Sequence, residues 1–258
     1  MNRIEVQYIT NLGLIRSINE DSILISNILL NQVNQENVST DILEIQENGC
    51  FFIVADGMGG QGQGEIASKI VLETFLKYIS QVHNEESIIN IISESKQNLD
   101  TLVKGNPKYL NFGTVIAGVY IIDNKVIVFN TGDSRVYKFD GMFCEQLSHD
   151  HSKVQEMVDY GLIRHEDINI QENKNVVTSA VIGNPKEKIP LINVKTINIK
   201  SNDMFMICSD GIWECMSIEN IESCLSHFDT SVECLTTKVF KSGANDNLSA
   251  IVLKVSNE

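Results

Sequence analysis

Two apolar segments of the chain end in an aspartate followed by a glycine. Residues 51–55 lead into Asp56-Gly57, and residues 204–209 lead into Asp210-Gly211. A carboxylate that leaves a buried strand and enters a flexible glycine turn is well placed to bind a metal ion. A single Asp-Gly pair is most often only a turn, but the repetition of the pattern indicates an enzyme with a metal centre.

Further aspartates lie beside small or polar residues, namely Asp21, Asp133 and Asp246. An apolar run precedes Asp133 and another follows Asp246, so we expect these carboxylates at strand ends that meet at one rim of a sheet. Mg²⁺ and Mn²⁺ prefer oxygen ligands and keep several waters, and Gly57 has no Cβ to keep its carbonyl away from an ion. Two ions about 3.5–4 Å apart activate a shared water for in-line attack. The pattern predicts hydrolysis without a covalent intermediate.

A candidate phosphate ligand, Arg16, lies in a polar turn shortly before Asp21. Its forked guanidinium matches a pair of phosphate oxygens, so we expect it to bind the phosphate group of a substrate. The alternative is an ordinary surface arginine, and the spacing alone does not separate the two interpretations.

Length and charge narrow the classes of protein. The 258 residues carry a formal net charge of −14, and 43% are apolar. This is enough to bury one substantial core, and we expect a single domain over residues 1–258. Nucleic-acid binding depends on clustered Lys and Arg, so we expect no nucleic-acid partner. There is neither a basic-then-apolar leader nor an apolar run of about 18 residues, so we expect a soluble cytoplasmic protein without membrane contact.

Histidine, cysteine and tryptophan are expected outside the metal centre. Hard cations do not select imidazole, so the histidines are assigned to the surface or to a flap. The cysteines form no CxxC pair, which predicts reduced packing residues instead of a disulfide framework. Trp213 is expected to be a packing anchor beneath the site. The other residues concerned are His83, His149, His151, His165 and His227, and Cys50, Cys144, Cys208, Cys215, Cys224 and Cys234.

Hydrophobic periodicity predicts the elements that carry these side chains. Strands are expected at 4–10, 22–30, 51–55, 115–122, 125–130, 136–139, 143–147, 191–199, 204–209 and 248–255. Helical spacing predicts two long amphipathic helices within 66–79 and 88–102, and shorter ones at 154–160, 218–226 and 231–242. Residues 31–48 are expected to be a surface excursion, and residues 150–175 a mobile flap. Strict β-α-β alternation is missing, which favours antiparallel sheets flanked by helices.

Seven short blocks follow one another along nearly the whole chain: Arg16-x-x-Asn19-Glu20-Asp21-Ser22, Val54-Ala55-Asp56-Gly57-Met58-Gly59-Gly60, Gly113-Thr114, Gly132-Asp133-Ser134-Arg135, Asp150-His151-Ser152, Ser209-Asp210-Gly211-Ile212-Trp213 and Asp246-Asn247. Together they resemble the metal-dependent serine/threonine protein phosphatases of type 2C (PPM), particularly their compact bacterial branch. The resemblance implies an α+β fold, a four-layer α-β-β-α sandwich of two packed antiparallel sheets flanked by helix pairs.

The resemblance also implies roles for the acidic residues. Asp56 would bridge two Mn²⁺ or Mg²⁺ ions, and Gly57 would offer its carbonyl oxygen. The remaining ligands would be Asp210 and Asp246 on one side and Glu20 or Asp21 on the other.

A third, weaker ion is implied between Asp133 and Asp210, and Arg16 would bind the substrate phosphate. The alternative for Asp133 is a turn residue paired with Arg135. The chain departs from the family at Met58, where the eukaryotic branch has a histidine proposed as the general acid. It departs from bacterial relatives again in residues 178–183, Thr-Ser-Ala-Val-Ile-Gly, which lack the arginine often found there.

The implied function is hydrolysis of phosphoserine and phosphothreonine in proteins by a monomer that opposes a bacterial serine/threonine kinase. One alternative is a catalytically inactive phosphatase-like module that binds a regulator, and the retention of Asp21, Asp56, Asp210 and Asp246 argues against it. The other is a phosphomonoesterase for small molecules, which a closed pocket would favour over an open one.

Overall fold

The computed structural model describes residues 2–45, 47–59, 62–164, 167–168, 171 and 176–257. Its strands are β1 (Asn2–Asn11), β2 (Ser22–Ile25), β3 (Ile28–Asn31), β4 (Ser39–Glu44), β5 (Cys50–Met58), β6 (Gly113–Ile122), β7 (Lys125–Thr131), β8 (Arg135–Phe139), β9 (Cys144–Gln146), β10 (Val181–Ile182), β11 (Asn193–Asn198), β12 (Met204–Cys208) and β13 (Leu248–Asn257). Its α-helices are α1 (Gly64–Tyr78), α2 (Glu85–Gly105), α3 (Lys153–Asp159), α4 (Asp210–Trp213), α5 (Ile218–Leu225) and α6 (Ser231–Lys241).

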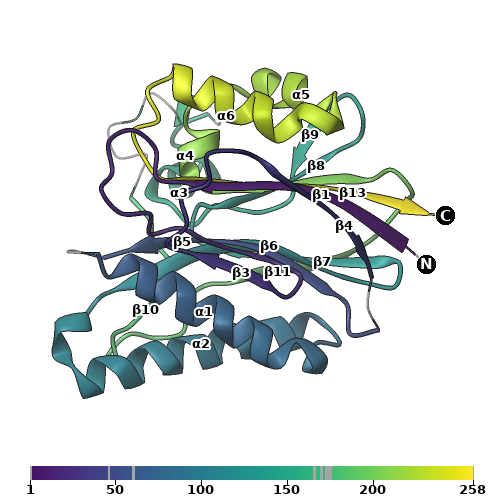
Figure 1. The fold of residues 1–258 in the computed structure, drawn as a ribbon. Helices are drawn as coiled ribbons and strands as arrows, with labels where there is room; N and C mark the ends of the chain where they lie inside the picture. The colour runs from purple at the N-terminus through teal and green to yellow at the C-terminus, as the bar shows by residue number, and fades with distance from the viewer. Residues whose placement is uncertain are drawn as a thin grey trace.

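The described strands form two antiparallel sheets. One has the order β4-β1-β13-β12-β8-β9, and the other has the order β11-β7-β6-β5-β2-β3, with β10 paired to β6. Figure 1 shows the sheets stacked face to face, with α5 and α6 outside the first and α1 and α2 outside the second. The predicted α+β fold, a four-layer α-β-β-α sandwich, is confirmed.

The continuous apolar run of β5 explains how the layers hold together. Side chains alternate between the faces of a strand, so Phe52 and Val54 pack between the two sheets, whereas Phe51 and Ile53 pack against the layer of α1 and α2. Both faces of β5 are therefore buried, and its end is a rigid place for a functional side chain.

The helices form as their patterns predict. In α2 the side chains of Ile88, Ile91, Ile92 and Leu99 are buried on one face, and the Asn84 side chain caps the helix by accepting a hydrogen bond from the Ser87 amide at 3.0 Å. No helix within the described ranges is both long enough and apolar enough to cross a membrane.

Several local predictions need correction. The predicted strand at 22–30 is a hairpin of two strands, because Ser26 adopts a positive φ of 57° and turns the chain. The predicted surface excursion at 31–48 contains β4, which pairs with β1 at the sheet edge. Its alternating half-buried and exposed residues give only a weak apolar signal.

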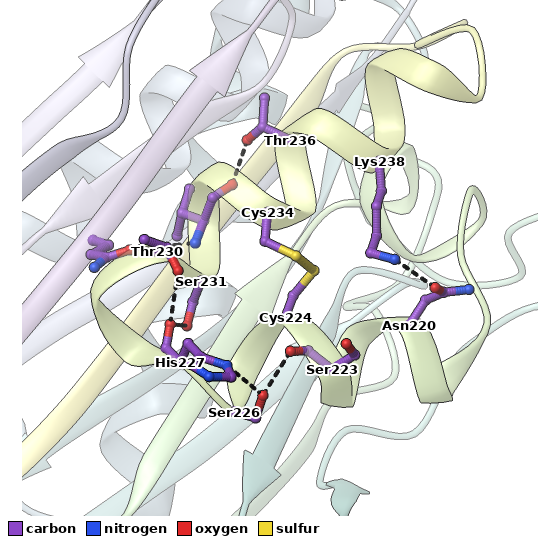
Figure 2. The surroundings of a disulfide bond; sticks show 12 residues. Asn220, Ser223, Cys224, Ser226, His227, Thr230, Ser231, Cys234, Thr236 and Lys238 are labelled. Carbon is purple, nitrogen blue, oxygen red and sulfur yellow. Dashed lines mark hydrogen bonds between the residues drawn. A yellow bond between two sulfur atoms is a disulfide. The ribbon is translucent and has the colours of Figure 1, made fainter.

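The cysteine prediction is wrong for one pair. Cys224 on α5 and Cys234 on α6 form a disulfide that joins the two outer helices (Figure 2). Lys238 also links these helices by donating to the Asn220 side chain at 2.7 Å. Cys50 and Cys208 are buried free thiols, as predicted. Sequence spacing did not reveal the bridge, because the helices must first pack before the two sulfurs meet.

The predicted flap at 150–175 is described in part. It begins with α3, and a bridge between Ser152 and Val177 closes its base. Residues 165–166, 169–170 and 172–175, including His165, lie outside the described residues, so its predicted mobility stays a prediction.

Candidate active site

A cleft of about 510 Å³ lies where the end of β5 meets the β7–β8 turn, the start of α4 and the segment before β13. All but one of the predicted site residues line it, namely Arg16, Glu20, Asp56, Gly57, Asp133, Asp210 and Asp246. The fold thus brings together carboxylates from distant parts of the chain.

The last residues of β5 place Asp56 and Gly57 in the cleft. Thr114 on β6 donates its hydroxyl to the Asp56 carbonyl at 2.7 Å, which fixes the backbone there. A Cβ on Gly57 would lie 2.4 Å from the Gly64 carbonyl carbon and 2.5 Å from the Glu20 carbonyl oxygen. Glycine is required because the start of α1 and the Glu20 backbone both press against this strand end.

A second close approach brings Asp210 next to Asp246. Asp210 is the first residue of α4, directly after β12. A Cβ on Gly211 would lie 2.0 Å from the Asn247 carbonyl oxygen. Only a glycine lets the helix start touch the segment that carries Asp246.

The side chain of Asn247 ties the polar turn at 12–20 to the end of the chain. Its Oδ1 accepts a hydrogen bond from the Glu20 amide at 2.9 Å, and its Nδ2 donates to the carbonyls of Leu12 and Ile18 at 3.0 Å each. The turn that carries Arg16 is therefore held against the carboxylates. Sequence reasoning gave Asn247 no role, although it stands in the Asp246-Asn247 block.

Glu20 and Asp21, which the sequence left as alternatives, occupy different positions. Glu20 faces the cleft, and its Oε1 accepts a hydrogen bond from the Gly64 amide at 3.0 Å. Asp21 lies behind the cleft and is 1% exposed. Its Oδ2 accepts from the Ser209 and Ser249 hydroxyls at 3.0 and 2.7 Å, while its buried Oδ1 accepts no hydrogen bond from the described residues. The two serines were not predicted.

The carboxylates repel one another. Burial raises the pKa of Asp56 well above its usual range, and the charges of Asp21, Asp210, Asp133 and Asp246 raise it further. Burial likewise raises the pKa of Asp210, with Asp133 and Asp246 as the next causes. For Asp133, burial and then the charge of Asp150 raise the pKa to about 7. Such a cluster favours either protons or a bound cation.

The Arg16 guanidinium lies at the rim of the cleft and is half-exposed. Its Nη2 contacts Asp246 Oδ2 at 2.6 Å. Among the described residues, no three His, Cys, Asp or Glu side chains lie close enough together to form a ready set of ligands for one ion.

The structure does not support the alternative interpretation of Asp133 as a turn residue paired with Arg135. Arg135 binds Asp150 instead, with its Nη2 2.7 Å from Asp150 Oδ2. Asp133 is left to face the cleft. Trp213 is buried, as predicted for a packing anchor, but its Nε1 also donates to the Asp133 carbonyl at 3.0 Å.

The histidines that the structure describes lie outside the cleft. His83, His149 and His227 are exposed, as predicted. His151, at the start of the flap, is buried and accepts a hydrogen bond from the Gly132 amide on its Nδ1 at 3.1 Å. Burial lowers the pKa of His151.

Known proteins similar in sequence to this chain include bacterial protein phosphatases. The serine/threonine phosphatase stp of Listeria monocytogenes serotype 4b is 26% identical over 83% of this chain and 87% of its own length. Protein phosphatase PhpP of Streptococcus pneumoniae serotype 2 is 27% identical over 81% of this chain and 87% of its own.

Solved structures share the fold. The catalytic domain of the serine threonine protein phosphatase PstP, in complex with two manganese ions, superposes with a TM-score of 0.79 at 22% identity, over 100% of both chains. The Mycobacterium tuberculosis phosphatase PstP/Ppp gives 0.80 at 22% identity, over 99% of this chain and 100% of that chain. A family model described as protein phosphatase 2C matches residues 26–252. The chain therefore belongs to the protein phosphatase 2C family.

Proposed function

We propose that this protein hydrolyses phosphoserine and phosphothreonine in other proteins and depends on two Mg²⁺ or Mn²⁺ ions. The observation that carries the proposal is the convergence of Asp56, Asp133, Asp210 and Asp246 on one cleft with Arg16 at its rim. The manganese-bound structural neighbour and the bacterial phosphatase relatives support it.

The residues of the cleft suit hard divalent cations. The side-chain atoms that we propose as metal ligands are all carboxylate oxygens, which such ions prefer. Asp21 Oδ1 is buried and accepts no hydrogen bond from the described part of the chain. A cation would offset both the burial and the neighbouring negative charges that raise the pKa of Asp56. In this assignment Asp56 and the Gly57 carbonyl would hold the two ions. Glu20, Asp210 and Asp246 would be further ligands, and Asp21 would contribute from behind the cleft.

Bound divalent ions supply an activated water and offset the charge of the phosphoryl group. Arg16 binds and orients the phosphate through its fork, and releases Asp246 as it does so. Met58 lines the cleft but has no proton to donate. We therefore assign protonation of the departing alcohol to solvent water, which reaches the open cleft.

The decisive experiment measures phosphate release from phosphoserine, phosphothreonine and phosphotyrosine peptides and from a small aryl phosphate. We expect release from the first two peptides with Mn²⁺, none in excess EDTA, and release slower by a factor on the order of 10³ from the Asp56→Asn variant. Full activity in EDTA would exclude the metal mechanism. Turnover of the aryl phosphate alone, without any peptide, would favour the small-molecule alternative.

The proposal extends to the domain organisation, the substrates, the location and the oligomeric state. We propose one phosphatase domain over residues 1–258 with a flap at about 150–175, supported by a structural match that covers the whole chain. The substrates are products of a bacterial serine/threonine kinase, and the enzyme works as a cytoplasmic monomer. Sedimentation of the purified protein tests the monomer, and dephosphorylation of a kinase from the same cell tests the partner.

A further inference from the structure

The turn between β7 and β8 carries Asp133 and connects the two sheets, and it is held by residues of α4 and of the segment just before α3. The carbonyl of Asp133 accepts a hydrogen bond from Trp213 Nε1 at 3.0 Å. The preceding residue, Gly132, exchanges two hydrogen bonds with His151, through the His151 amide at 2.9 Å and its Nδ1 at 3.1 Å. These contacts fix the direction in which the Asp133 carboxylate points.

The position of Trp213 links this turn to a second carboxylate. Trp213 is the last residue of α4, whose first residue is Asp210. One short helix therefore carries Asp210 at one end and, at the other, the indole that holds the backbone of Asp133. The strands next to the two carboxylates already pair, with Cys208 opposite Arg135, and the Trp213 hydrogen bond adds a direct tie between α4 and the turn of Asp133.

A buried cation keeps the indole in place. The Arg135 guanidinium lies 3.5 Å from the centre of the Trp213 ring. Asp150 holds the guanidinium from the side, accepting from its Nε and Nη2 at 2.9 and 2.7 Å. Tyr137 accepts from its Nη1 at 3.0 Å. Arg135 is 9% exposed and Asp150 is 4% exposed, so solvent does not compete with this arrangement.

We propose that Trp213, clamped by Arg135 and Asp150, is a positioning residue that sets Asp133 against Asp210 and so controls the affinity of a weaker divalent-cation site shared by those two carboxylates. The proposal rests on the proposed function for the presence of ions in the cleft. It adds a determinant of ion affinity that lies outside the ligands themselves.

The test uses Trp213→Phe, which keeps an aromatic ring against Arg135 and removes only the Nε1 donor. Calorimetric titration of the chelator-stripped protein with Mg²⁺ should give a tight and a weak class of binding in the wild type. In Trp213→Phe the weak class should bind about tenfold less tightly, as expected for the loss of one buried hydrogen bond, while the tight class is unchanged. The turnover number should fall at limiting Mg²⁺ and recover at high Mg²⁺, with the KM for peptide unchanged.

Tyr8→Phe is the matched control. It removes a hydrogen bond of 2.8 Å from Tyr8 to Asp41, between β1 and β4 and away from the cleft. Both classes of binding should be unchanged in this variant. Equal weakening in both variants would indicate general loosening of the fold and would overturn the proposal.

Trp213 is the only tryptophan in the chain, so its fluorescence reports directly on the turn. Its emission should change as Mg²⁺ fills the weak site, and Asp133→Asn should abolish that phase. Unchanged Mg²⁺ binding in Trp213→Phe, a single class of binding in the wild type, or a fluorescence phase that survives Asp133→Asn would each overturn the proposal. These readouts need no turnover, so an enzyme that binds ions as described but hydrolyses no phosphopeptide would refute only the proposed function.

Discussion

Replacing Asp133 by asparagine should stabilise the metal-free protein, and more so as the pH rises. The side chain is 4% exposed, and its pKa is raised from 3.8 to about 7. A carboxyl whose pKa is raised on folding favours the folded state while it is protonated. That contribution is complete below the unfolded pKa, near 4, and is lost as the pH rises through about 7.

The size of the stabilisation follows from how far the pKa of Asp133 is raised on folding. The rise in the pKa of Asp133 costs the folded wild type about 4 kcal/mol at pH 8 and about 2 kcal/mol at pH 5. Asparagine has nearly the same volume and does not ionise, so the variant avoids this cost. For a chain of this length the difference at pH 8 corresponds to a gain in Tm on the order of 10 °C.

Differential scanning calorimetry in excess EDTA at pH 5, 6, 7 and 8 measures the gain. Asp229→Asn, which changes an exposed carboxylate on the outer helix layer, is the control and should follow the wild type. A Tm difference between Asp133→Asn and the wild type that stays constant from pH 5 to 8 would refute the reasoning, as would a variant that is less stable at pH 8. Saturating Mg²⁺ should shrink the gain, because the ion stabilises the ionised carboxylates of the wild type.

Three further perturbations separate the parts of the site. Asp56→Asn should lower turnover by a factor on the order of 10³ and abolish tight Mn²⁺ binding in calorimetry, and normal turnover would mean that the bridging ligand is misassigned. Arg16→Ala should raise the KM for a phosphopeptide about tenfold with little change in kcat, because a phosphate ligand contributes equally to substrate and transition state; a fall in kcat alone would contradict this. Replacing Cys224 and Cys234 together by serine should lower the free energy of unfolding by about 3 kcal/mol, as expected for a short closed loop, and leave turnover intact. Urea denaturation measures the last effect. Thiol titration of the unfolded, unreduced wild type should find the four cysteines outside the bridge, and six thiols would show that the bridge is not formed.

Much of the site was predictable from the sequence because its signals are local. Asp56 and Asp210 each end an apolar strand and enter a glycine turn, and the structure places both in the cleft. The two long helices follow from apolar periodicity, and the missing β-α-β alternation favoured antiparallel sheets flanked by helices. The four-layer sandwich was implied by the resemblance to the phosphatase family. The roles of the individual ligands stay predictions, since they concern ions and substrate.

What the sequence could not supply depends on contacts between distant segments. Glu20 and Asp21 stand just before β2, so the pair could not be resolved until the path of that connecting segment was known. The hydrogen bonds of the Asn247 side chain to the polar turn join residues more than 220 positions apart. The disulfide of Cys224 similarly depends on how α5 and α6 pack. The edge strand β4 was missed because half of its side chains face solvent.

The place of β13 in its sheet has a consequence for synthesis of the enzyme. This last strand lies between β1 and β12, and the two residues just before it, Asp246 and Asn247, complete the cleft. A nascent chain that stops short of this segment exposes two unpaired strand edges, which favour aggregation. It also lacks Asp246, which lines the cleft, and the Asn247 side chain that holds the turn of Arg16. Synthesis of β13 and completion of the cleft are therefore coupled, because the residues just before this strand finish the one and the strand itself fills the sheet.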